Sequence, residues 1–161
     1  MAAGLIVGVV RVLLPFALMG NGLAAGGMMI AVLGGAPLLL SLPTERYVPT
    51  HQFMVTRFDP FMPACMLTAL LCDVALAFAA PTARASTLFT LSALLLVGAI
   101  VVSLTKNVPI NRWIATVDPG RLPANWEQLD PRVRWSNWNR VRTALVVCSL
   151  AVLVAVTGTL L

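Results

Sequence analysis

The chain has 161 residues, of which 59% are hydrophobic and only 11% are charged, and its net charge is +5. This composition, with a mean hydropathy of +0.90, excludes an ordinary soluble domain, whose surface could not carry so much apolar side-chain area. Most basic residues lie beside apolar stretches, where they orient a membrane protein and meet anionic lipid headgroups, so we expect no nucleic-acid partner.

The apolar stretches predict an all-α fold, an integral membrane four-helix bundle in a single domain covering residues 1–161. The spans are expected at about residues 12–36, 61–80, 85–105 and 141–161. Small residues in the first span favour close helix contact. Between the first two spans, Thr50–Phe58 is expected to form a short amphipathic helix at the interface, with Phe53, Met54 and Phe58 on its apolar side and His51 among its polar groups.

Four spans place both termini on one side of the membrane and the first and third connections on the other. Nine of the eleven Lys and Arg residues lie in or beside those two connections: Arg46, Arg57, Lys106, Arg112, Arg121, Arg132, Arg134, Arg140 and Arg142. The positive-inside rule therefore predicts a protein of the cell membrane in which the connections form a polar cytoplasmic cap and both termini lie outside.

The connection between the third and fourth spans, Lys106–Arg142, is the most informative part of the chain. It holds all four tryptophans and seven of the eleven basic residues. Within it, Asn107 and Asn111 are four residues apart and would share a helical face if the third span continued past the membrane. An aromatic belt at the interface would account for the tryptophans, but it does not account for paired amides.

The start of the fourth span carries a second stripe of this kind. Trp135, Asn139 and Arg142 follow i, i+4, i+7 spacing, which sets an aromatic ring, an amide and a guanidinium along one face of a helix. Because Arg142 lies deepest, we expect it to turn inward, towards a carboxylate, an amide or an anionic ligand oxygen.

Two further ionisable residues need an interpretation. Asp73, in the middle of the second span, is expected to face the bundle interior in a helix–helix hydrogen bond, for instance to Asn21 or to a threonine of a span, rather than to act in a proton relay. His51 is the only histidine, and its side chain suits proton transfer near neutral pH. Glu45 and Asp59 fall on the same predicted side of the membrane. A single histidine and three separated cysteines argue against a structural zinc site.

These motifs resemble the anthrone oxygenase-like family of small four-span membrane proteins. The resemblance covers nearly the whole chain and is most specific in NVPINRWIATVDP at Asn107–Pro119 and WSNWNRVRT at Trp135–Thr143, with HQFMVTRFDPFMP at His51–Pro63 similar to one subset. It implies a monooxygenase-type oxidoreductase of secondary metabolism, which oxidises a hydrophobic polyketide anthrone to an anthraquinone with dioxygen.

Removal of one carbon-bound proton converts an anthrone into an electron-rich enolate, so a base and an oxyanion-stabilising group could suffice. The candidate catalytic residues are His51 as the base and Arg142 with Asn139 as the oxyanion and orientation group. The candidate substrate-binding residues are Asn107, Asn111, Trp135 and Trp138, the tryptophans by stacking on a flat substrate.

Alternatives remain open at this point. A metal-dependent oxidase would use His51, Glu45 and Asp59 as ligands of a transition metal, and no cofactor at all is the leading expectation. A non-catalytic module would use the amides and tryptophans only to shape the membrane interface or to hold a homo-oligomer. Transport is a weaker choice, since four spans with one central carboxylate leave little room for a pathway.

Overall fold

The structure, a computed structural model, describes residues 2–58 and 60–160 and is helical almost throughout them. The helices form four long rods. The first rod consists of α1 (Ala2–Ile30), the π-helical turn η1 (Ala31–Gly35) and α2 (Ala36–Ser41), and the second of α3 (Thr44–Phe58) and α4 (Phe61–Ala79). The third consists of α5 (Ala83–Val102), the π-helical turn η2 (Ser103–Asn107) and α6 (Val108–Thr116), and the fourth is α8 (Arg132–Leu160), preceded by the short α7 (Trp126–Leu129).

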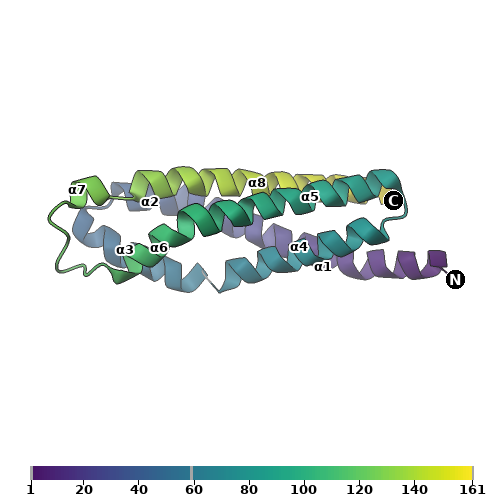
Figure 1. The fold of residues 1–161 in the computed structure, drawn as a ribbon, viewed down its shortest axis with the longest axis horizontal. Helices are drawn as coiled ribbons and strands as arrows, with labels where there is room; N and C mark the ends of the chain where they lie inside the picture. Colours follow the sequence, from purple (N-terminus) through teal and green to yellow (C-terminus); the bar gives the residue numbers. More distant parts are fainter. Residues whose placement is uncertain (1, 59, 161) are drawn as a thin grey trace.

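The rods pack as an antiparallel bundle. Figure 1 shows α5 and α8 running along one another, with both chain termini at one end and α3, α6 and α7 at the other. Each rod contains a helical stretch of 34 to 36 residues, counting α7 with α8, that is long and apolar enough to cross a membrane. The prediction of an all-α membrane bundle of four helices is confirmed. Rods of this length reach roughly 50 Å, whereas the hydrocarbon core needs only about 30 Å, so the charged end that carries α3, α6 and α7 extends beyond the apolar span.

The helices continue further than the spans expected from the sequence. Helix α1 begins before Arg11 and runs through Pro15 without a break. Apolar surroundings favour a continuous helix, because it pairs nearly all backbone groups within the segment, and they tolerate a proline in it. The third rod continues to Thr116, and Pro109 falls in the first turn of α6, directly after the π-helical turn η2. Helix α8 already begins at Arg132.

Helix α3 differs from the expected interfacial helix in length and in the placement of its histidine. It starts at Thr44, and Pro49 lies inside it rather than ahead of it. The polar and apolar sides expected for this helix do not match its packing, because the His51 side chain is fully buried, while Phe53 is 61% exposed. The packing of α3 against α6 explains this difference: Gln52 Nε2 donates to the carbonyl oxygens of Ile114 and Val117 at the end of α6.

Three apolar layers follow one another along the bundle. The layer nearest the termini is built around Phe89, Leu76 and Leu153, and the middle layer around Met66, Leu96 and Val146. The third layer lies at the end of the bundle formed by α3, α6 and α7, referred to below as the cap, and contains Tyr47, Ile114, Trp126 and Trp135. Fully buried polar side chains also lie along the bundle axis, in α1, α3, α4, α5 and α8 and in the turn η2. They form the site and the polar cluster described below.

Candidate functional site

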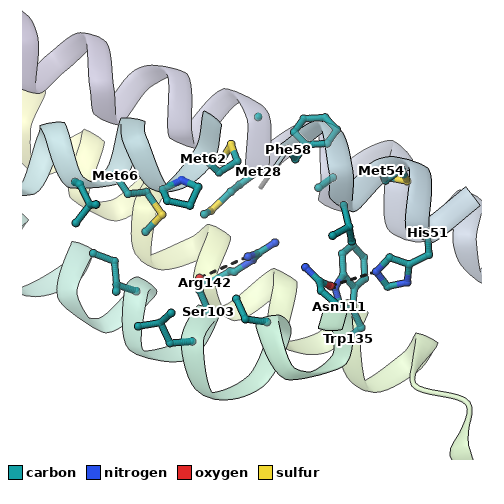
Figure 2. A pocket seen from close by; sticks show the side chains of 18 residues that line it. Met28, His51, Met54, Phe58, Met62, Met66, Ser103, Asn111, Trp135 and Arg142 are labelled. Carbon is teal, nitrogen blue, oxygen red and sulfur yellow. Dashed lines mark hydrogen bonds between the residues drawn. The ribbon is translucent and has the colours of Figure 1, made fainter. Parts of the chain in front are cut away.

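A cavity of about 260 Å³ lies between the middle apolar layer and the layer under the cap. Most of its wall is apolar, and methionines contribute much of it. Figure 2 shows Met28, Met62 and Met66 on one side of the cavity and His51, Asn111 and Trp135 on the other, with the side chain of Arg142 between them. The cavity therefore combines an adaptable apolar end with a polar end.

Both π-helical turns border this cavity. Ala31 of η1 and Ser103 of η2 belong to its wall. A π-helical turn holds an additional residue, which changes the direction of the side chains that follow it, and such turns recur at functional sites. The turn η2 ends at Asn107 and leads directly into α6, on which Asn111 points at α8.

His51, Asn111 and Trp135 form one hydrogen-bonded group at the polar end. The side-chain oxygen Oδ1 of Asn111 lies 2.9 Å from Trp135 Nε1 and 3.2 Å from His51 Nε2. On the other side of the imidazole, Nδ1 lies 2.8 Å from the hydroxyl of Tyr47, one turn earlier on α3. The imidazole ring also meets the Trp135 ring edge-on at a centroid distance of 5.0 Å.

The indole of Trp135 decides the proton positions in this group. An indole N–H is only a donor, so Asn111 must present its oxygen and not its NH₂ to it. The same oxygen faces His51 Nε2, which must therefore carry the hydrogen. In the neutral ring, Nδ1 is then the acceptor of the Tyr47 hydroxyl. The amide NH₂ of Asn111, a residue of the cavity wall, is left for the cavity.

This arrangement bears on the expected role of His51 as a base. The ring is buried, and both of its partners, a phenol and an amide, are uncharged, so the neutral imidazole is favoured over the cation. Its lone pair points at Tyr47 and not into the cavity. His51 forms part of the cavity wall, but in this geometry it orients Asn111. To act as the base, the ring would first have to release Tyr47.

Arg142 is partly buried and belongs to the cavity wall. Its Nε donates to Asn139 Oδ1 at 2.9 Å, and its Nη1 lies 3.5 Å from Ser103 Oγ. Figure 2 shows the guanidinium directed into the same cavity as the side-chain amide of Asn111. The geometry thus brings a fixed positive charge and an amide to one end of an apolar chamber.

The other three candidate residues, Asn107, Trp138 and Asn139, lie outside the cavity wall. Asn139 is fully buried, is absent from the cavity wall and accepts a hydrogen bond from Arg142. Asn107, also fully buried, donates through Nδ2 to the backbone carbonyl of Trp135 at 3.2 Å, so it fixes α8 against the third rod. Trp138 is absent from the cavity wall, and the ammonium of Lys106 lies 5.1 Å from the centre of its ring. The structure therefore separates Trp138 from the residues at the cavity.

Two residues near His51, Tyr47 and Arg132, were not predicted from the sequence to belong to the site. Tyr47, the partner of His51, is fully buried, and the guanidinium of Arg132 lies 5.0 Å from its ring centre. Arg132 also donates to the carboxylate of Asp130 and to the carbonyl oxygen of Leu42 at the end of the first rod. The i, i+4 spacing of Tyr47 and His51 was the available signal. The methionines of the cavity wall carried no comparable pattern.

The expected metal ligands do not come together in the described part of the chain. His51 uses both ring nitrogens within the protein, Glu45 lies on an exposed side of α3, and Asp59 lies outside the described residues. Across residues 2–58 and 60–160, no group of three His, Cys, Asp or Glu side chains is arranged to hold a metal ion.

A comparison with protein families shows to which family this chain belongs. The family model described as anthrone oxygenase matches residues 52–152, well over half of the sequence. The chain belongs to the anthrone oxygenase family. The matched segment of this family member contains Asn111, Trp135, Asn139 and Arg142, whereas His51 lies one residue before it. No curated protein and no solved structure gave a significant match.

Proposed function

We propose that this family member is a membrane oxygenase that converts a flat, anthrone-type aromatic molecule into the corresponding anthraquinone with dioxygen. The observation that carries the proposal is the pairing of the Arg142 guanidinium with the Asn111 amide at one end of an otherwise apolar cavity. Both residues lie in the segment matched by the anthrone oxygenase family. This pairing is what a hydrophobic substrate with one oxygen that becomes negatively charged would require.

The size and lining of the cavity suit a compact aromatic substrate. Ligand pockets typically span about 300–1,000 Å³, so a cavity of about 260 Å³ takes a small ring system and not a lipid. Thioether groups of Met28, Met62 and Met66 offer polarizable contacts to the faces and edges of aromatic rings. We place the rings of the substrate against these methionines, with its carbonyl oxygen towards Arg142 and Asn111.

The reaction needs no external reductant. Loss of a proton from the methylene carbon opposite the carbonyl gives an enolate, whose negative charge rests largely on the carbonyl oxygen. The methylene carbon gives electrons to dioxygen and forms a carbon–oxygen bond, and protonation yields a hydroperoxide. Cleavage of the O–O bond, with loss of the second proton from that carbon, gives the new carbonyl and one water. The sum is one anthrone and one dioxygen to one anthraquinone and one water.

The protein's part in this scheme is to stabilise the enolate. The guanidinium of Arg142 favours the anionic oxygen over the neutral ketone, and the NH₂ group of Asn111 adds a hydrogen bond that strengthens as charge develops. The enol tautomer of the substrate carries an acidic hydroxyl, so a cation beside it promotes loss of the proton to water. Tyr47, His51 and Trp135 act as positioning residues, since they fix the orientation of Asn111.

Oxygen consumption by the purified protein, with an anthrone as substrate, tests this proposal. Loss of one oxyanion-stabilising group lowers rates by about 10²–10³-fold in other enzymes, so we expect Arg142→Gln to lower kcat by about 10²-fold. Arg140→Gln is the matched control, because Arg140 is exposed on the same helix and absent from the cavity wall. Anthrones oxidise slowly on their own, so each rate is taken above a protein-free background. Equal rates in the two variants would overturn the assignment of Arg142.

A further inference from the structure

A second buried polar cluster lies in the membrane-spanning part of the bundle, and it is independent of the proposed function. It consists of Asn21, Asp73, Ser92 and Ser149, whose side chains are all fully buried. One residue comes from each of α1, α4, α5 and α8, and none of the four belongs to the cavity wall. The expectation that Asp73 makes a helix–helix hydrogen bond is met by Ser92, with Asn21 two steps further along the same chain of contacts.

The hydrogen bonds of this cluster run in one direction. Ser92 Oγ donates to Asp73 Oδ2 at 2.6 Å, so its only hydrogen is committed to the carboxylate. Ser149 Oγ lies 2.8 Å from Ser92 Oγ and must be the donor there, or else donate to the Ser92 carbonyl oxygen at 3.2 Å. Asn21 Nδ2 in turn donates to Ser149 Oγ at 2.8 Å. Ser149 and Asn21 are thus connected through Ser92 to the carboxylate of Asp73.

The cluster is left with two buried oxygens that have no hydrogen-bond partner in the described part of the chain, Asp73 Oδ1 and Asn21 Oδ1. Both are acceptors. A buried acceptor without a partner is costly, and a buried carboxylate needs either a neutralising charge or a proton. A positive group that interacts with oxygen would satisfy both acceptors and balance the carboxylate.

We propose that Asn21, Asp73, Ser92 and Ser149 bind a sodium ion. Every side-chain atom available to it is a hard oxygen donor: a carboxylate, an amide carbonyl and two hydroxyls. A single carboxylate balances one positive charge, so a monovalent ion leaves the cluster neutral, whereas a divalent ion would leave an uncompensated charge between apolar layers. Because each spanning rod contributes one residue, the bound ion stabilises the packing of all four rods.

The test is the thermal unfolding midpoint of the full chain in lipid nanodiscs, measured with increasing NaCl while choline chloride keeps the ionic strength constant. A ligand that binds only the folded state raises this midpoint as its concentration increases. We expect a rise with sodium that potassium and choline do not reproduce. Asp73→Asn should abolish the response and yet fold, because its amide oxygen can still accept from Ser92 and its NH₂ group supplies a donor in place of the ion.

Ser41→Ala is the matched control, since the hydroxyl of Ser41 donates to the carbonyl oxygen of Leu38 in its own helix and lies outside the cluster, and it should keep the full sodium response. If Asp73→Asn fails to fold, Ser149→Ala, which removes one of the proposed oxygen ligands, should weaken the sodium response in its place. The wild-type comparison of sodium with choline remains decisive. A wild-type midpoint that does not depend on sodium would show that Asp73 is neutralised by a proton, and it would overturn the proposal. A sodium response that survives in Asp73→Asn would overturn it as well.

Discussion

The hydrogen bond from Trp135 to Asn111 offers a measurable test of how the cavity is organised. Trp135→Phe retains an aromatic ring but removes the indole N–H that lies 2.9 Å from Asn111 Oδ1. The oxygen keeps His51 as its second donor, so it is not left unpaired, and the loss is limited to about one hydrogen bond. Such a bond contributes about 1 kcal/mol net, which corresponds to a roughly fivefold change in a rate or equilibrium constant. We therefore expect kcat/KM for an anthrone to fall about fivefold.

The control for this prediction lies one turn further along α8. Trp138 is absent from the cavity wall, and its ring faces Lys106, so Trp138→Phe should change kcat/KM by less than about twofold. A double-mutant cycle separates orientation from packing: if Trp135 acts through Asn111, Trp135→Phe should have little further effect once Asn111 is replaced by alanine. Steady-state kinetics of the four proteins provide the measurement. Additive effects of the two substitutions would refute the reasoning.

Glycines of the first rod provide further predictions. A Cβ at Gly20 would lie 2.8 Å from the backbone oxygen of Cys65, so Gly20→Ala must push α1 away from α4 and should cost about 1–3 kcal/mol of stability, seen as a lower unfolding midpoint. Gly22→Ala meets no atom within 4 Å and should leave the midpoint unchanged or raise it slightly; a similar loss in both variants would contradict the packing described. A Cβ at Gly27 would lie 2.9 Å from Met62 Sδ, so Gly27→Ala should move the thioether into the cavity and raise KM for ring-substituted anthrones more than for anthrone itself, and equal KM changes would contradict this.

The fold was largely predictable from the sequence because hydropathy determines which segments enter a membrane. Four apolar stretches and two polar connections lead to one arrangement of an antiparallel bundle. What hydropathy could not indicate is where a helix continues past the apolar stretch. The third rod runs to Thr116 through Pro109 because a π-helical turn precedes α6. No pattern of hydrophobic residues distinguishes such a turn from a regular one.

The site was predictable in part, for reasons of helical geometry. Spacing indicates that Asn107 and Asn111 share one face of the third rod, and in the structure both form hydrogen bonds with Trp135. The orientation of His51 was not predictable, because it depends on the packing of α3 against α6 rather than on any feature of α3 alone. The same limit applies to Asp73, whose hydrogen-bond partner Ser92 lies on another rod and is linked to Ser149 and Asn21 on the remaining two. Contacts between distant segments depend on how nearly uniform apolar helices pack.

In the proposed function, the cavity at Arg142 and Asn111 carries an oxygenation that uses only an anthrone and dioxygen. The most direct test follows this reaction with ¹⁸O₂ and the purified protein in nanodiscs, recording oxygen uptake, anthraquinone formation and the position of the label. We expect the uptake of one dioxygen molecule per anthraquinone formed, at a rate well above the protein-free background. One labelled oxygen should appear in the new carbonyl group and the other in water. Unlabelled anthraquinone, or a rate no higher than that background, would contradict it.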